Sequence, residues 1–149
     1  MDILSLNKIN IVFIAILFFQ ACKKEVQTRE VSSDNFSYPF LIEGFENQEI
    51  QNATVYLKKA NQKVIDSGYF KIINQGKPAQ AMIRFHHSNL IAPKDSILIQ
   101  IRDSKSFITA LEEIPVESRS KGSSPFVLQY NLNGKVYTED EEAVISNTR

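Results

Sequence analysis

The chemically reactive side chains of this 149-residue chain are few, and their spacing matches no common catalytic centre. The two histidines, His86 and His87, are adjacent, and neighbouring residues of a strand point to opposite faces. They cannot both bind one metal ion without distortion, so we expect His86 to be exposed and His87 to pack at a strand end. The carboxylates of Glu43, Asp66 and Asp103 are candidates for acid–base chemistry, but no motif gathers them.

The common catalytic signatures are missing from the sequence. It contains no G-x-S-x-G, no H-E-x-x-H and no phosphate-binding or calcium-binding loop. The acidic run Glu139 to Glu142 is typical of a solvated terminus, and cation binding is the alternative, although alternation would aim these side chains in different directions. The sequence therefore predicts no catalytic residue, no metal site and no cofactor.

The single cysteine, Cys22, follows a short apolar run near the start of the chain. The run extends from Ile9 to Phe19, behind Lys8, and Ala21 directly precedes the cysteine. A helix that crosses a membrane needs about 20 apolar residues, so this run is too short. A short apolar run behind a cation and ahead of a small residue is instead typical of a secretory signal peptide.

This segment resembles the signal peptide of bacterial lipoproteins, in which a small residue precedes a cysteine that is acylated and becomes the first residue of the mature chain. The resemblance implies that residues 1–21 are removed and that Cys22 carries the lipid. It also implies a lipid-anchored protein of the bacterial cell envelope. The outer membrane is the favoured location, and both its periplasmic face and its surface face are open alternatives. Two or more acyl chains hold a protein at a membrane essentially permanently. The alternatives are an uncleaved anchor or a buried apolar segment with a buried thiol.

The residues after the cysteine and the overall charge narrow the classes of partner. Residues 22–35 are polar and lack apolar periodicity, which predicts a flexible tether that reaches at most about 43 Å.

The chain has 17 basic and 17 acidic residues, and Lys8 and Asp2 cancel, so the net charge is zero with or without the signal peptide. Zero net charge gives no field to attract nucleic acid or an anionic membrane. With Cys22 lipidated, no thiol remains for a disulfide or a zinc site.

From Phe36 onward, apolar residues recur at every second position and are rich in Ile, Val, Phe and Tyr, which is the period of half-buried strands. We expect a polar turn at Glu46 to Glu49, and a bulge or bend at Gly68 that lets Phe70 and Ile72 face inward. The stretch Ser106 to Val116 also fits a helical spacing, and we favour the strand. The expected strands cover residues 37–45, 52–58, 64–73, 81–85, 96–102, 106–116, 126–132 and 136–139.

The strongest local pattern is a hairpin. Apolar residues alternate from Phe126 to Leu132, Asn133-Gly134 follows, and the chain returns from Val136. Asn-Gly readily adopts the positive φ angles of a two-residue hairpin turn, so Gly134 is expected to have a positive φ. After this hairpin, Ala143 to Ile145 either docks on the domain or frays.

About eight strands without helices require two sheets packed face to face or one sheet closed on itself. We predict an all-β fold, an antiparallel β-sandwich of immunoglobulin-like or transthyretin-like kind, over residues 36–145, with a tail at 146–149. The segment Leu41 to Ile73 resembles the β-sandwich domains at the front of many envelope lipoproteins, through Ala53-Thr54-Val55-Tyr56-Leu57, Ile65-Asp66-Ser67 and Gly68-Tyr69-Phe70.

Two tripeptides match glycosylation acceptors. Asn52-Ala53-Thr54 fits the N-glycosylation pattern, which we interpret as chance in a bacterial chain. Asp95-Ser96-Ile97 resembles the acceptor for O-glycosylation in some Gram-negative envelopes, and Pro93 places it at a loop end. Ser96 is therefore a candidate O-glycosylation site.

The hypothesis that the sequence favours is a lipid-anchored binding or accessory module that contacts an envelope protein or a glycan. Its site would lie on loops, of which Asn74 to Ala79, Ser88 to Asp95 and Glu117 to Pro125 are the candidates. The first alternative is an envelope enzyme that uses the scattered carboxylates, and it would need them to converge in a pocket. The second alternative is an inhibitor or immunity lipoprotein.

Overall fold

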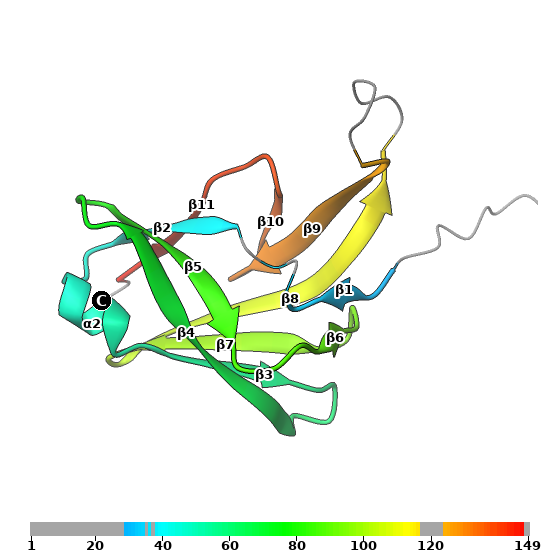
Figure 1. Ribbon diagram of the computed structural model, residues 1–149, viewed down its shortest axis with the longest axis horizontal. Coiled ribbons are helices and arrows are strands. Elements are labelled where there is room, and N and C mark those ends of the chain that lie inside the picture. Colours follow the sequence, from blue (N-terminus) through cyan, green and yellow to red (C-terminus); the bar gives the residue numbers. More distant parts are fainter. Residues whose placement is uncertain (1–28, 35, 37, 117–123, 148–149) are drawn as a thin grey trace, which may run out of the picture.

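The computed structural model describes residues 29–34, 36, 38–116 and 124–147, and nearly all of its elements are strands (Figure 1). The all-β prediction is confirmed. The predicted signal peptide, Cys22 and most of the predicted tether lie outside the described residues. The elements in chain order are β1 (Val31–Ser32), β2 (Pro39–Glu43), α2 (Asn47–Gln51), β3 (Thr54–Lys58), β4 (Val64–Asn74), β5 (Ala79–Phe85), β6 (Leu90–Ile91), β7 (Ser96–Ile101), β8 (Ser104–Pro115), β9 (Phe126–Leu132), β10 (Lys135–Thr138) and β11 (Ala143–Ser146).

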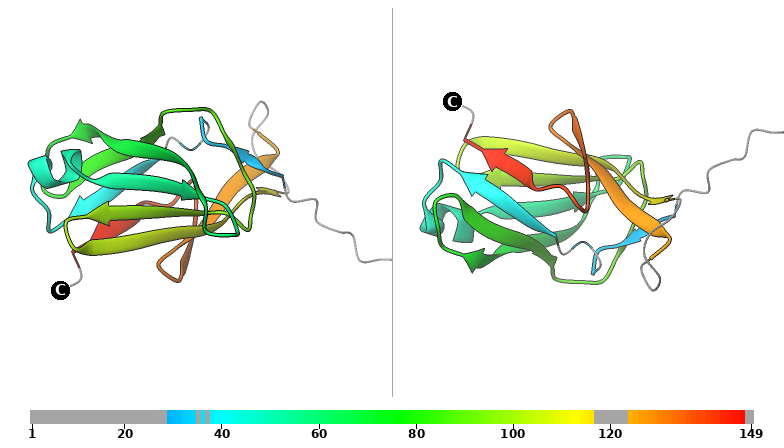
Figure 2. Two further views of the ribbon diagram at one scale, coloured as in Figure 1. Left: turned by 90° about the horizontal axis from the view of Figure 1, so that it is seen from below. Right: turned by 90° about the horizontal axis from the view of Figure 1, so that it is seen from above.

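Nine of these strands form one continuous sheet in the order β10-β9-β8-β7-β3-β4-β5-β2-β11, and β1 pairs with β6 in a small second sheet. The large sheet curls on itself into a nearly closed sandwich or barrel (Figures 1 and 2). Neighbouring strands in this sheet are antiparallel, except that β11 runs parallel to β2. Figure 2, right, shows β11 in red beside β2 in cyan. The segment Ala143 to Ile145 therefore docks on the sheet.

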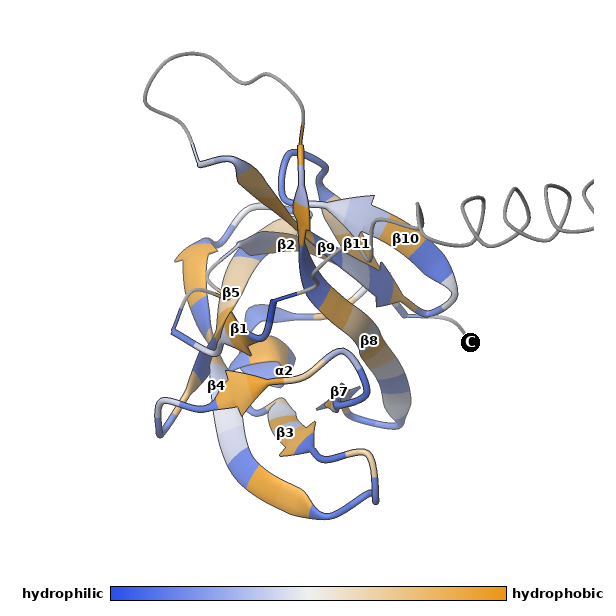
Figure 3. Ribbon diagram, turned by 90° about the vertical axis from the view of Figure 1, so that its right-hand side faces the viewer, coloured by the Kyte–Doolittle hydropathy of each residue, from blue (hydrophilic) through white to orange (hydrophobic). Residues whose placement is uncertain are grey.

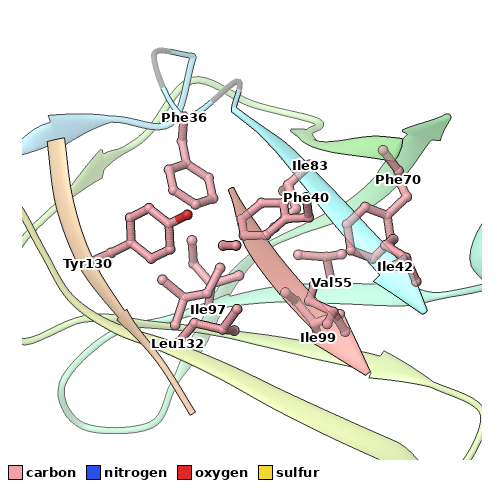
Figure 4. Packing of buried hydrophobic residues seen from close by; sticks show 14 of the residues in the cluster. Phe36, Phe40, Ile42, Val55, Phe70, Ile83, Ile97, Ile99, Tyr130 and Leu132 are labelled. Atoms are coloured by element: carbon pink, nitrogen blue, oxygen red, sulfur yellow. The ribbon is translucent and has the colours of Figure 1, made fainter. Parts of the chain in front are cut away.

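The core lies inside this curl, and Figure 4 shows its side chains converging from both halves of the sheet. The ring of Phe40 on β2 lies 5.9 Å from that of Phe36 and 6.1 Å from that of Tyr130 on β9, between ring centroids. In the sheet order, β2 and β9 are near opposite ends. The aromatic cluster of Phe36, Phe40 and Tyr130 therefore holds the curled sheet together across its interior.

The hairpin prediction is confirmed. Leu128, Tyr130 and Leu132 are buried on one face of β9, while Phe126 is half-buried. Asn133 and Gly134 both have positive φ, at 52° and 91°. The turn is also fastened to β8, because the Asn133 side-chain oxygen accepts a hydrogen bond from the Phe107 backbone N–H at 2.8 Å. The predicted strand at Ser106 to Val116 is confirmed as β8.

The bulge or bend predicted at Gly68 is wrong, because Gly68 is regularly paired on both sides. The register between β3 and β4 shifts near Lys58 of β3, and the register between β4 and β5 shifts near Ile72. From Asp66 to Ile72 the inner positions of β4 alternate without interruption. Figure 3 shows hydrophobic residues in orange and hydrophilic residues in blue following one another in bands along several strands. Gly68 is required for another reason, since a Cβ atom there would lie 2.4 Å from the backbone oxygen of Arg84 on β5. Only glycine permits this approach of two strands.

Two further expectations need correction. The tether predicted to end at residue 35 ends earlier, because Val31 is buried with 1% of its surface exposed and β1 pairs with β6. The polar turn predicted at Glu46 to Glu49 is part of the short helix α2, which buries Ile50. Glu49 stabilises its start by accepting a hydrogen bond from the Glu46 backbone N–H at 2.9 Å. In the described ranges, no helix has the length and apolarity needed to cross a bilayer.

Candidate functional site

The outer face of the sheet carries an exposed aromatic row across β8, β7 and β3. Phe107 on β8 lies opposite Leu98 on β7, and Leu98 lies opposite Tyr56 on β3. Figure 2, left, shows β4, β3, β7 and β8 side by side across this part of the molecule. Phe107 is 45% exposed, whereas Leu98 is only 9% exposed although it points away from the core. The two flanking rings therefore cover the leucine and form a shallow apolar strip with it.

A second pair of rings extends this strip over β4 and β5. Tyr69 is 45% exposed on β4, and its ring lies 5.7 Å from that of His86, between centroids, at an angle of 38°. Along β4, Tyr69 lies two residues beyond Ser67, which is directly opposite Tyr56. The prediction that His86 is exposed is confirmed. We call Tyr56, Tyr69, His86, Leu98 and Phe107 the aromatic face.

On the strands that carry the aromatic face, the outward charged residues beside the rings are basic. Lys58, Lys71, Arg84 and Lys105 occupy outward positions, as the strand registers show. No outward position of β3, β4, β5, β7 or residues 104–109 of β8 holds an Asp or a Glu. Exposed rings on an open strand surface can stack on flat ligands, and the cations beside them can bind acidic groups. The arrangement suits binding of an extended ligand.

Asp66, a predicted candidate for acid–base chemistry, is buried with 3% of its side chain exposed, and it accepts several hydrogen bonds. Its donors are the backbone N–H groups of Ser67 at 2.8 Å and His87 at 3.0 Å, the His87 ring nitrogen Nδ1 at 3.1 Å and Asn89 Nδ2 at 2.9 Å. Burial raises the pKa of Asp66, but the hydrogen bonds from His87 and Ser67 and the charge of His87 outweigh it and hold the pKa below its usual value. The carboxylate thus stays ionised at neutral pH.

This Asp66 network positions the chain rather than completing a catalytic centre. His87 was predicted to pack at a strand end, which is wrong, because its side chain is 80% exposed. An Asp–His pair can support nucleophilic catalysis when a hydroxyl lies against the histidine. The nearby hydroxyls are engaged elsewhere, since Ser33 Oγ bonds the backbone of His87 and Asn89, and Ser88 Oγ donates to Asp34. The network ties the segment after β5 to β4 and to the start of the domain.

The other predicted carboxylates do not converge with Asp66. Glu43 is exposed at the end of β2, and Asp103 is exposed in the turn between β7 and β8. The acidic run lies in the turn between β10 and β11, where Glu141 accepts a hydrogen bond from the Thr138 backbone N–H at 2.8 Å. The pocket that acid–base chemistry would need is not assembled from these residues.

A polar hollow of about 350 Å³ lies beside β1, β8 and β9, and Asp34, Glu113 and Glu139 contribute carboxylates to its lining. One oxygen of Glu139 accepts hydrogen bonds from the Tyr38 hydroxyl at 2.7 Å and from the Leu128 backbone N–H at 3.3 Å. In the part of the chain that the structure describes, no three His, Cys, Asp or Glu side chains are placed to hold a metal ion. The hollow is therefore a weaker candidate than the aromatic face.

The two glycosylation motifs lie in different settings. Asn52 and Thr54 are exposed at the junction of α2 and β3. Ser96 is half-buried at the first position of β7, and the carboxylate of Asp95 accepts hydrogen bonds from Lys59 Nζ at 2.8 Å and the Ala92 backbone N–H at 2.9 Å. The Asp95 side chain thus stabilises the turn before β7. Glycosylation of Ser96 stays a prediction.

The aromatic face was not predicted from the sequence, although a signal for it is present. Each Tyr or Phe of the aromatic face lies two residues from a lysine. The pairs are Tyr56 with Lys58, Tyr69 with Lys71, and Phe107 with Lys105. Residues two apart on a strand share a face, so the pattern Lys-x-aromatic or aromatic-x-Lys on three strands could have indicated it. No protein-family model, curated protein or solved structure matches this chain.

Proposed function

We propose that this protein is a lipid-anchored binding module of the bacterial cell envelope, and that it binds a glycan through the aromatic face. The observation that carries the proposal is the exposure of Phe107 and Tyr69 on an open sheet surface, with Tyr56 between them. The outer strands of a closed or nearly closed β fold are a known platform for oligosaccharides, and aromatic side chains supply much of the binding energy of such surfaces.

The anchor is the attachment that the sequence implies at Cys22. Val31 is the first residue of β1, so eight residues connect it to Cys22, and these nine residue-to-residue steps reach at most about 30 Å. The domain would therefore stay close to the bilayer, within reach of glycans at the membrane surface. A binding role is favoured over an enzymatic role because Glu43, Asp66 and Asp103 lie apart, while the aromatic side chains gather on one face.

We expect intact-mass analysis of the protein extracted from membranes to give a chain that begins at acylated Cys22. The short apolar run that ends at Ala21 motivates this expectation. Changing Cys22 to Ser should release the protein from the membrane fraction, because no acyl chain can then be attached. A membrane-bound chain that still begins at Met1 would contradict the lipid anchor.

The glycan-binding role is tested with the full-length protein in detergent and three immobilised probes, namely peptidoglycan sacculi, alginate and dextran. We expect the wild-type protein to bind at least one of them, and Tyr69→Ala combined with Phe107→Ala to weaken that binding at least tenfold, or about 1.4 kcal/mol. Both rings are 45% exposed, so the double variant should remain folded. Val136→Ala is the control, because this exposed residue lies on β10, outside the aromatic face. Equal binding by the double variant and the wild type would refute the proposed site.

A further inference from the structure

We infer that the ligand of the aromatic face is an acidic polysaccharide, one whose sugars carry carboxylate or phosphate groups. This inference rests on the proposed function and adds the chemical class of the glycan. It is argued from the position of the cations relative to the rings, from the lack of partners for those cations and from the charge of the whole chain.

The cations are interleaved with the rings. Lys58 follows Tyr56 by two residues on β3, and Lys71 follows Tyr69 by two residues on β4. Residues two apart on a strand are about 6.6 Å apart and point to the same side. On β8, Lys105 precedes Phe107 by the same interval. Each ring therefore has an ammonium group on its own strand, close enough for one sugar to contact both.

Arg84 adds a fourth cation beside the second ring pair. It lies directly opposite Tyr69, in the register between β5 and β4, and His86 lies two residues further along the chain. A guanidinium group can hold a carboxylate or a phosphate by two parallel hydrogen bonds. The Tyr69 ring and the Arg84 side chain together could bind one acidic sugar through its flat face and its charged group.

None of these four cations is neutralised by the protein within the described residues. Ion pairs there involve Lys59, Lys77, His87 and Arg102, and none of them involves Lys58, Lys71, Arg84 or Lys105. Among the described residues, no Asp or Glu stands at an outward position of β3, β4, β5, β7 or residues 104–109 of β8, and an acidic run lies in the turn between β10 and β11. The zero net charge of the whole sequence thus conceals a basic face. A polyanion would complete this face by charge complementarity.

The observations favour a polysaccharide over single-stranded nucleic acid. Nucleic-acid binding surfaces combine separate stacking platforms with a strongly positive field. Here Leu98 fills the position between Phe107 and Tyr56, which makes a continuous apolar strip in place of separate platforms. Phe107 and Tyr56 stand on alternate strands, about 9.6 Å apart at the backbone, and an extended chain of sugars could lie across them.

The test compares alginate, a polyuronate, with neutral dextran and a single-stranded oligothymidylate, using the full-length protein in detergent and thermophoresis at two salt concentrations. We expect alginate to bind at least tenfold more tightly than either other probe, and its affinity to fall as salt rises. Lys58→Gln combined with Arg84→Gln should weaken alginate binding at least tenfold. Lys94→Gln combined with Lys135→Gln removes the same charge from exposed positions outside the face and should leave it unchanged.

Each other outcome overturns a specific statement. If alginate and dextran bind with equal affinity, and the Tyr69→Ala and Phe107→Ala double variant loses both, the ligand is a glycan but not an acidic one. That result would refute this inference and support the proposed function. Tighter binding of the oligothymidylate would replace the polysaccharide by nucleic acid. Full alginate affinity in the Lys58 and Arg84 double variant would show that these cations do not contact the ligand. Failure to bind any glycan, including sacculi, would refute the proposed function itself.

Discussion

Replacing Phe40 by alanine is expected to lower the free energy of unfolding by about 3–5 kcal/mol, the usual range for a buried Phe changed to Ala. The Phe40 side chain is fully buried, and its ring contacts those of Phe36 and Tyr130. Removing it costs the transfer energy of the ring and leaves a cavity where the two ends of the sheet meet. Since domains of this size are stable by about 5–15 kcal/mol, urea unfolding should show a much lower midpoint.

Phe107→Ala is the matched control, because it removes the same atoms from a ring that is 45% exposed on the aromatic face. About half of that ring already contacts water in the folded protein, so its loss should cost about 1 kcal/mol or less. Equal destabilisation by the two changes would mean that Phe40 does not hold the curled sheet together in the way described.

Gly68→Ala is expected to lower the free energy of unfolding by about 1–3 kcal/mol, the second largest effect after that of Phe40→Ala. The added Cβ would lie 2.4 Å from the Arg84 backbone oxygen and 3.1 Å from the Phe85 ring. Gly68 is paired with Val55 on one side and Phe85 on the other, so β4 cannot move away without disturbing two ladders. Thermal unfolding of the purified variant should show a clearly lower Tm.

Gly76→Ala provides the comparison for that measurement. Gly76 is exposed, and the nearest atoms to its Cβ would lie at 3.4 Å, an ordinary contact. A surface substitution of this kind should change stability by about 0.5 kcal/mol or less. If Gly68→Ala melted at the same temperature as Gly76→Ala, the close approach of β4 and β5 would not be a tight constraint.

The strands were predictable because the alternation of apolar and polar residues that marks each strand lies within that strand's own sequence. Alternation along β9, together with Asn133-Gly134, set both the buried face of the hairpin and the sign of φ at Gly134. The same period identified β7 and β8. In each case, one face of the strand packs on the core and the residue types follow that burial.

The helix α2 and the pairing of β11 with β2 were not predictable in the same way. Five residues with Ile50 as their single buried side chain are too few to show a helical period. The parallel β11 pairing depends on where the curled sheet leaves an edge, which is a property of the whole fold. Asp66 was an isolated carboxylate in the sequence, and only the fold brings His87 and Asn89 to it.

The candidate site was missed for a related reason. Net charge is a sum over the chain, and it was zero, so a basic face was not expected. Whether Tyr56, Leu98 and Phe107 lie in one row depends on the registers of three strands, and a shift of one residue would send each side chain to the other face. The sequence shows which aromatic residues are present, but only the pairing of the strands brings them together on one face.

The parallel pair of β2 and β11 also bears on how the protein folds. It joins Phe40 to Ala143, two residues about 100 positions apart, so the last strand completes a sheet that the second strand begins. Contacts between such distant segments slow folding, because a large loop must close before they stabilise the chain. The domain therefore cannot complete its sheet during synthesis until β11 has emerged.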